Sequence, residues 1–148
     1  MSLFNPSRDE VRQFFFETWR KYRQSLEMTP LEGIALQVVW MHPEYHEVLD
    51  APERYAAREY FPEMGETNPF LHMSLHVSVM EQLSINQPPG ISEIYQSLLR
   101  RHGEPHPAQH DVLECLAETI WKAQRERAAP DGPAYLACLR GKAGVEQP

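Results

Sequence analysis

Residues 68–90 have the sequence NPFLHMSLHVSVMEQLSINQPPG, which contains the clearest helix signal of the chain. Asn68 followed by Pro69 is typical of a helix start, because asparagine caps free backbone N–H groups and proline fits the first helical position. The stretch NQPPG at residues 86–90 ends the helix. We therefore predict a helix over residues 69–86. His72 and His76 lie one turn apart on its inward, apolar face.

Similar signatures before and after this stretch predict an all-α fold. Ser7 and Glu10 form a capping box, Thr29 and Pro30 repeat the cap-plus-proline start, and no segment alternates as a strand does. We expect a helical bundle of four main helices with additional short helices. The main helices are predicted at residues 8–24, 30–42, 69–86 and 107–127, and the short ones near 53–60, 92–101 and 133–140. The 148 residues suit one domain, with residues 141–148 as a flexible tail.

Three pairs of side chains that can bind metal recur at helical spacing. They are His42 and His46 in HPEYH, His72 and His76 in HMSLH, and His110 and Glu114 in HDVLE. A spacing of four places both members of a pair on one face of a helix. In the first pair, the proline at position 43 puts His42 at a helix end and His46 in the first turn of the next helix.

The chemistry of these side chains points to a metal site. On the helix at 107–127, His110 and Glu114 fall on the apolar face, and a buried carboxylate must be protonated, paired or bound to metal. Neutral imidazole and carboxylate suit Zn, Fe, Mn, Ni or Cu. We predict one or two divalent transition-metal ions (Fe, Zn, Mn or Ni), with His106 as a reserve ligand. The predicted ligands are His42, His46, His72, His76, His110 and Glu114.

Two other interpretations of the histidines stay open. In the first, the protein binds no metal and is a helical interaction protein whose histidines pair with carboxylates and sense pH. In the second, the metal has an open position, where water is activated for hydrolysis or iron meets oxygen. The sequence does not choose between them, so neither catalysis nor a substrate is assigned.

Composition narrows the range of partners and locations. The chain has 14 basic and 21 acidic residues, a net charge of −7, which argues against a nucleic-acid partner. No apolar run approaches the roughly 18 residues of a membrane span, and the first twenty residues are too charged for a secretory signal. We expect a cytoplasmic protein, in which Cys115 and Cys138 are small buried hydrophobes that do not pair. A protein partner and a homo-oligomer stay open.

Several segments resemble a known but uncharacterised family. FNPSRDEVRQFFFETWRKY, NPFLHMSLH, EQLSINQPPG and HDVLECLAETIWKAQ are similar to a bacterial family, domain of unknown function 1841. This resemblance covers nearly the whole chain and implies a bacterial origin, but it implies no activity.

Two further resemblances concern the site alone. The paired HxxxH and HxxxE motifs are distantly similar to those of hemerythrin-like bundles, although the order of the pairs differs; the resemblance implies only a metal held between helices. His76, the pair His110 and Asp111, and Asp131 follow the residue order of HD phosphohydrolases. That order implies a third alternative, a metal-dependent phosphohydrolase.

Overall fold

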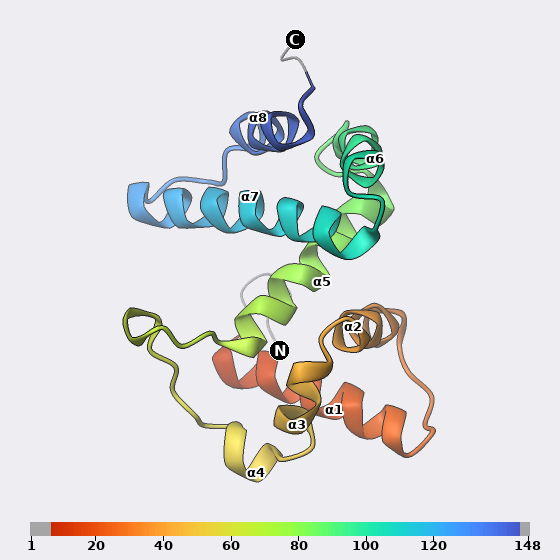
Figure 1. Ribbon diagram of the computed structural model, residues 1–148. Helices are drawn as coiled ribbons and strands as arrows, with labels where there is room; N and C mark the ends of the chain where they lie inside the picture. The colour runs from red at the N-terminus through yellow and green to blue at the C-terminus, as the bar shows by residue number, and fades with distance from the viewer. Residues whose placement is uncertain (1–6, 146–148) are drawn as a thin grey trace. The chain divides into compact units, whose positions relative to one another are not determined.

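The structure is a computed structural model that describes residues 7–145, and every regular element within that range is helical (Figure 1). The all-α prediction is confirmed. The chain divides into two compact units between Val77 and Ser78, and α5 (Pro69–Ile85) contributes to both. The single bundle of four main helices is not confirmed, because those helices are distributed over the two units.

The first unit contains most of the short elements. Its α1 packs against α2 and α3, and α3 packs against α4. The elements are α1 (Arg8–Arg23), α2 (Pro30–Trp40), η1 (Pro43–Tyr45), α3 (His46–Leu49), α4 (Pro52–Tyr55), η2 (Pro62–Met64) and the start of α5.

Side-chain caps begin the three long helices of this unit, as predicted. Ser7 and Glu10 form a capping box at α1, and Thr29 and Glu32 form another at α2. The Asn68 Oδ1 atom accepts hydrogen bonds from two backbone N–H groups in the first turn of α5, at 3.0 and 3.2 Å. These bonds satisfy donors that a helix start leaves without a backbone partner.

Helix α4 is shorter than the predicted helix at residues 53–60. The buried Arg12 side chain, 2% exposed, donates from Nη1 to the carbonyl oxygens of Tyr55, Ala56 and Arg58, at 3.2, 3.2 and 2.7 Å. Bonds from a charged donor are stronger than those between neutral groups. A side chain from α1 thus stabilises the backbone after α4 in a non-helical path.

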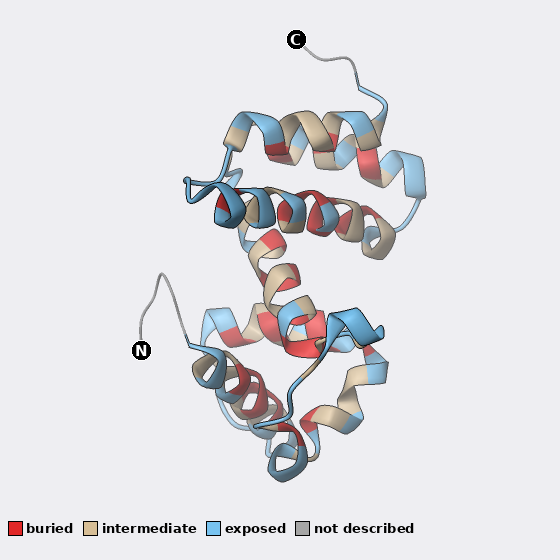
Figure 2. Cartoon of the chain, turned by 90° about the vertical axis from the view of Figure 1, so that its left-hand side faces the viewer, coloured by how far each residue is buried: buried red, intermediate tan, exposed pale blue. Residues whose placement is uncertain are grey.

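The core of the first unit combines aromatic and aliphatic side chains. Buried residues, red in Figure 2, recur along the helices that face this core. The buried apolar residues of the unit are Phe15, Phe16, Trp19, Ala35, Val38, Val39, Leu49, Tyr55, Phe70, Met73 and Val77. Two histidines, His42 and His76, are buried with them.

The second unit is built from the end of α5 and from α6 (Ile91–His102), α7 (Pro105–Glu126) and α8 (Gly132–Ala143), and these last three contact one another in pairs. Helix α7 begins two residues before the prediction, since both Pro105 and Pro107 fit a first turn whose N–H groups need no intrahelical partner. Helix α8 continues into the predicted tail, and residues 146–148 lie outside the described range.

The helices of the second unit bury one side each. The buried apolar residues of the unit are Val79, Ile91, Ile94, Leu98, Ala108, Val112, Leu113, Cys115, Leu116, Ala123, Tyr135 and Leu139. No helix within residues 7–145 is long and apolar enough to cross a bilayer.

The prediction that the two cysteines do not pair is wrong. Cys115 on α7 and Cys138 on α8 form a disulfide, with Cα atoms 5.9 Å apart. The sequence did not reveal this pairing because it depends on how two helices pack and not on a local spacing such as CxxC. The cytoplasmic location, from which the unpaired cysteines were argued, stays a prediction.

Candidate metal centre

His42 lies at the junction between α2 and η1, in a backbone conformation set by the following proline. Its φ of −128° and ψ of 69° are not helical, as expected for a residue before Pro43. The side chain is 1% exposed, and its Nδ1 atom lies 2.8 Å from the carbonyl oxygen of Val38. Because a carbonyl oxygen only accepts, Nδ1 carries the proton and Nε2 presents a lone pair. The ring is therefore fixed in the tautomer that binds metal through Nε2.

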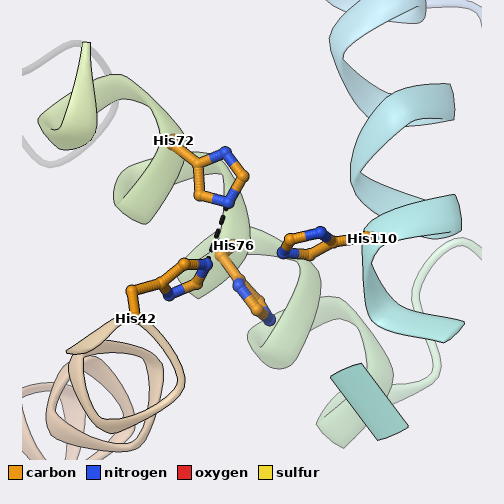
Figure 3. Close-up of side chains that lie close together, drawn as sticks. All are labelled: His42, His72, His76 and His110. Carbon is orange, nitrogen blue, oxygen red and sulfur yellow. Dashed lines mark hydrogen bonds between the residues drawn. The ribbon is translucent and has the colours of Figure 1, made fainter. Parts of the chain in front are cut away.

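His72 and His76 stand one turn apart on the part of α5 that belongs to the first unit. His76 is fully buried and His72 is half-buried. Their ring centroids lie 4.7 Å and 5.2 Å, respectively, from the ring centroid of His42. The structure thus brings together three of the predicted ligands, one from the end of α2 and two from α5 (Figure 3).

The nitrogen atoms of these rings converge. Nε2 of His42 lies 3.0 Å from Nε2 of His72, a hydrogen bond drawn as a dashed line in Figure 3. One ring nitrogen of each of the three histidines lies within 4.8 Å of those of the other two. Zinc–nitrogen bonds are about 2.0–2.1 Å long, so nitrogens that bind one zinc ion tetrahedrally lie roughly 3.3 Å apart. The two most distant of the three ring nitrogens, at most 4.8 Å apart, would therefore have to approach each other by at most about 1.5 Å to bind one ion.

Tyr45 covers one side of this histidine cluster, defined as His42, His72 and His76. Its ring stacks on that of His42, with centroids 5.2 Å apart and an interplanar angle of 10°. Burial raises the pKa of Tyr45, and the negative charge of Glu44 raises it further, so the phenol is neutral at pH 7. Sequence reasoning missed Tyr45, although its place three residues after His42 was a usable signal.

His46 is not part of the cluster. Its Nε2 atom donates to the carbonyl oxygen of Val39 at 3.0 Å, and its ring packs against Trp19 and Trp40. The spacing of four in HPEYH does not place both rings on one face, because the backbone changes from α2 through η1 to α3 between them. The prediction that HPEYH supplies two converging ligands is not supported by this geometry.

Glu114 does not face inward as predicted. Its side chain is 66% exposed and accepts a hydrogen bond from Lys142 Nζ at 2.7 Å. The buried face of α7 runs through Ala108, Val112 and Cys115, so the projected apolar stripe was turned too far around the helix. A carboxylate in solvent with a lysine partner needs no metal to balance its charge.

His110 and His106 lie in the second unit, near the start of α7. Their Nε2 atoms are 2.9 Å apart, one donating to the other. This contact exists because α7 begins at Pro105, which makes His106 helical and places it one turn before His110. The role of His110 as a ligand stays a prediction from the sequence.

The acidic residues of the HD-like order have other partners. Asp111 Oδ2 lies 2.6 Å from His102 Nε2, and Asp131 caps α8 by accepting from the backbone N–H of Ala134. A helix cap is an ordinary structural role for aspartate. These contacts give no support to the phosphohydrolase alternative.

Comparison with known proteins gives a family but no activity. The model of the family described as "Domain of unknown function (DUF1841)" matches residues 7–141. No curated protein and no solved structure matches the chain. The resemblance seen in the sequence segments is confirmed, and any function must be argued from the cluster itself.

Proposed function

We propose that this chain, which belongs to the DUF1841 family of unknown function, binds a divalent transition-metal ion through His42, His72 and His76. The observation that carries the proposal is the convergence of three ring nitrogens from two separate segments in a buried place. Burying two of these imidazoles and half-burying the third costs solvation free energy unless their polar atoms find partners. An ion accepts a lone pair from all three at once.

The contact between His42 and Val38 supports this proposal. Ligating histidines in metalloproteins commonly donate their other ring N–H to a carbonyl or carboxylate, which fixes the tautomer and the ring orientation. His42 already has this arrangement through its 2.8 Å contact with the Val38 carbonyl. Without metal, Nε2 of His72 must be the donor to His42, so binding requires His72 to give up that proton or move it to Nδ1.

The donor set favours some metals over others. Within the described residues, no aspartate, glutamate or cysteine joins the group of converging ligand atoms. Neutral nitrogen donors suit Zn²⁺, Fe²⁺, Ni²⁺ and Cu²⁺, whereas Mn²⁺ prefers oxygen. We therefore propose Zn²⁺, Fe²⁺ or Ni²⁺ as the ion and place Mn²⁺ last among the metals predicted from the sequence.

His110 is proposed as a further ligand from the sequence pattern. His46 and Glu114 are left out of the proposed set, since no ring nitrogen of His46 joins the converging ligand atoms and Glu114 pairs with Lys142 in solvent. The His110→Ala variant tests this residue separately. A ligand role predicts a clear loss of metal affinity, and an unchanged affinity would remove His110 from the set.

The experiment that tests the site is elemental analysis of the full chain. Wild type and the His42→Ala, His72→Ala and His46→Ala variants are loaded with Zn²⁺, Fe²⁺ or Ni²⁺, desalted and analysed for metal per chain. We expect near-stoichiometric metal in wild type and His46→Ala, and loss in the other two. His46→Ala is the matched control, because His46 is also a partly buried histidine of the first unit but lies outside the cluster.

A metal-free network is the alternative function, and one observation favours it. The hydrogen bond between His42 and His72 satisfies both nitrogens without an ion. In that case the protein is a helical interaction protein and the cluster is structural. Equal, near-zero metal in wild type and all variants, with the same thermal stability before and after chelation, would establish this alternative.

A further inference from the structure

The histidine cluster supplies no negative charge to an ion. Its three donors are imidazoles, which bind a metal as neutral ligands, and within the described residues no aspartate, glutamate or cysteine joins their group of converging ligand atoms. The nearest acidic residue in the sequence, Glu44, is exposed. A divalent ion held here would keep its full charge.

Such a charge is unfavourable in this environment. His42 and His76 are 1% and 0% exposed, so an ion between them is largely removed from water. An uncompensated buried charge is strongly unfavourable, and proteins normally balance it with a ligand or partner of opposite sign. Because no carboxylate or thiolate of the described residues joins the converging ligand atoms, a ligand from solution is the remaining way to bring negative charge into contact with the ion.

The coordination number leaves room for that balance. Three protein ligands leave a tetrahedral ion with an open position, as in zinc sites where a non-protein ligand takes the fourth place. If His110 supplies a fourth nitrogen, the charge is unchanged, because imidazole is neutral, and the external ligand becomes the fifth. The need for an anion thus depends on the charge of the donors and not on their number.

We propose that the metal-loaded protein binds a small monovalent anion directly at the ion. This inference rests on the proposed metal site and adds the chemical class of its ligand. The anion lowers the net charge of the buried centre from +2 to +1, which is the physical reason for its affinity. His72 is half-buried, whereas His42 and His76 are buried.

A Co²⁺ titration tests the inference on the full chain. Co²⁺ replaces Zn²⁺ in nitrogen sites and has visible absorption bands that respond to a change of ligand. Sodium azide is the probe, and sodium perchlorate at equal ionic strength is the control. We expect azide to shift the bands along a saturable curve and perchlorate to leave them unchanged. Bands that azide does not move would overturn the inference, whereas failure to take up Co²⁺ would overturn the metal site itself.

A matched pair of variants tests the charge argument. His72→Glu replaces a neutral ligand with an anionic one, and His72→Gln has the same size without the charge. We expect the Co²⁺-loaded His72→Glu variant to bind azide at least about tenfold more weakly than the Co²⁺-loaded His72→Gln variant. The reason is that the negative carboxylate of the glutamate repels the negative azide. Equal azide affinities in the two variants would contradict the proposal, even if wild type responds to azide.

Discussion

The side chains of the first unit that donate to main-chain carbonyls include Arg12, His42 and His46, and these bonds help to separate structural residues from the candidate ligands. Arg12 holds the backbone after α4, and His46 uses its Nε2 on the carbonyl of Val39. His42 uses only Nδ1, on Val38, and directs Nε2 toward His72. The carbonyl contact thus fixes which ring nitrogen presents a lone pair, Nε2 in His42 and Nδ1 in His46, and the position of that nitrogen decides whether it joins the cluster, as it does for His42.

Glu32 gives a pH prediction at this scale. Its buried carboxylate accepts from the Thr29 backbone N–H at 2.8 Å and from Lys21 Nζ at 3.0 Å. Burial alone would raise the pKa of Glu32, but these hydrogen bonds outweigh it and lower the pKa below 4.5. The carboxylate thus stabilises the fold above pH 4.5, and this contribution is lost as pH falls through the lowered pKa. We expect Glu32→Gln to lower the free energy of unfolding by about 1–2 kcal/mol at pH 7.

Urea unfolding at several pH values measures this effect. The difference between wild type and Glu32→Gln should shrink as the pH falls below 4.5, because the wild-type carboxyl is then protonated. The exposed Glu27→Gln variant serves as the control and should change stability by less than about 0.5 kcal/mol. If the difference in unfolding free energy between wild type and Glu32→Gln stayed constant down to the lowest pH measured, the charge of Glu32 would not be the cause of that difference.

At the scale of elements, the orientation of α7 about its own axis decides two outcomes. Its buried face includes Cys115, which pairs with Cys138 on α8, and leaves Glu114 outside with Lys142. Adjacent residues in a helix point about 100° apart, so a small error in locating the apolar face exchanges their roles. The disulfide and the ion pair both join α7 to α8.

The disulfide between Cys115 and Cys138 is expected to stabilise the packing of α8. Helix α8 buries only Tyr135 and Leu139, and the disulfide closes a loop with a sequence separation of 23. Loop closure of this length is worth roughly 3 kcal/mol. We expect the phosphine reductant TCEP to lower the melting temperature of the wild-type chain and to leave the Cys115→Ala/Cys138→Ala variant unchanged. Two thiols that react with maleimide in unreduced, denatured protein would show that the bond is not formed.

At the scale of the whole molecule, the two units carry different chemistry. The histidine cluster lies within residues 42–76 of the first unit, and the disulfide lies in the second. Metal and reductant should therefore act on different parts of the chain. This separation allows each to be followed independently in one protein.

Hydrogen exchange measured by mass spectrometry tests this division. Metal at 100 times its dissociation constant stabilises the folded state by about 2.7 kcal/mol, which slows exchange through metal-releasing openings roughly 100-fold. We expect slower exchange at residues 38–46 and 69–77, reversed by EDTA and missing in His72→Ala. Slower exchange at residues 106–114 as well would support His110 as a ligand. Equal slowing along the entire chain would contradict a site confined to the cluster.

Much of the local structure could be predicted because its causes lie within one helical turn. The caps at Ser7, Thr29 and Asn68 and the non-helical backbone before Pro43 each depend on residues at most a few positions apart. Helix α4 was predicted too long, because the residue that holds the following backbone, Arg12, is more than 40 positions away in the sequence.

The sequence by itself determined the all-α class, the capped starts of α1, α2 and α5, and the pairing of His72 with His76 one turn apart on α5. Only the tertiary structure decided that His42 joins them and His46 does not. The reason is physical: capping and helical spacing act between neighbouring residues, whereas the convergence of side chains depends on how separate helices pack.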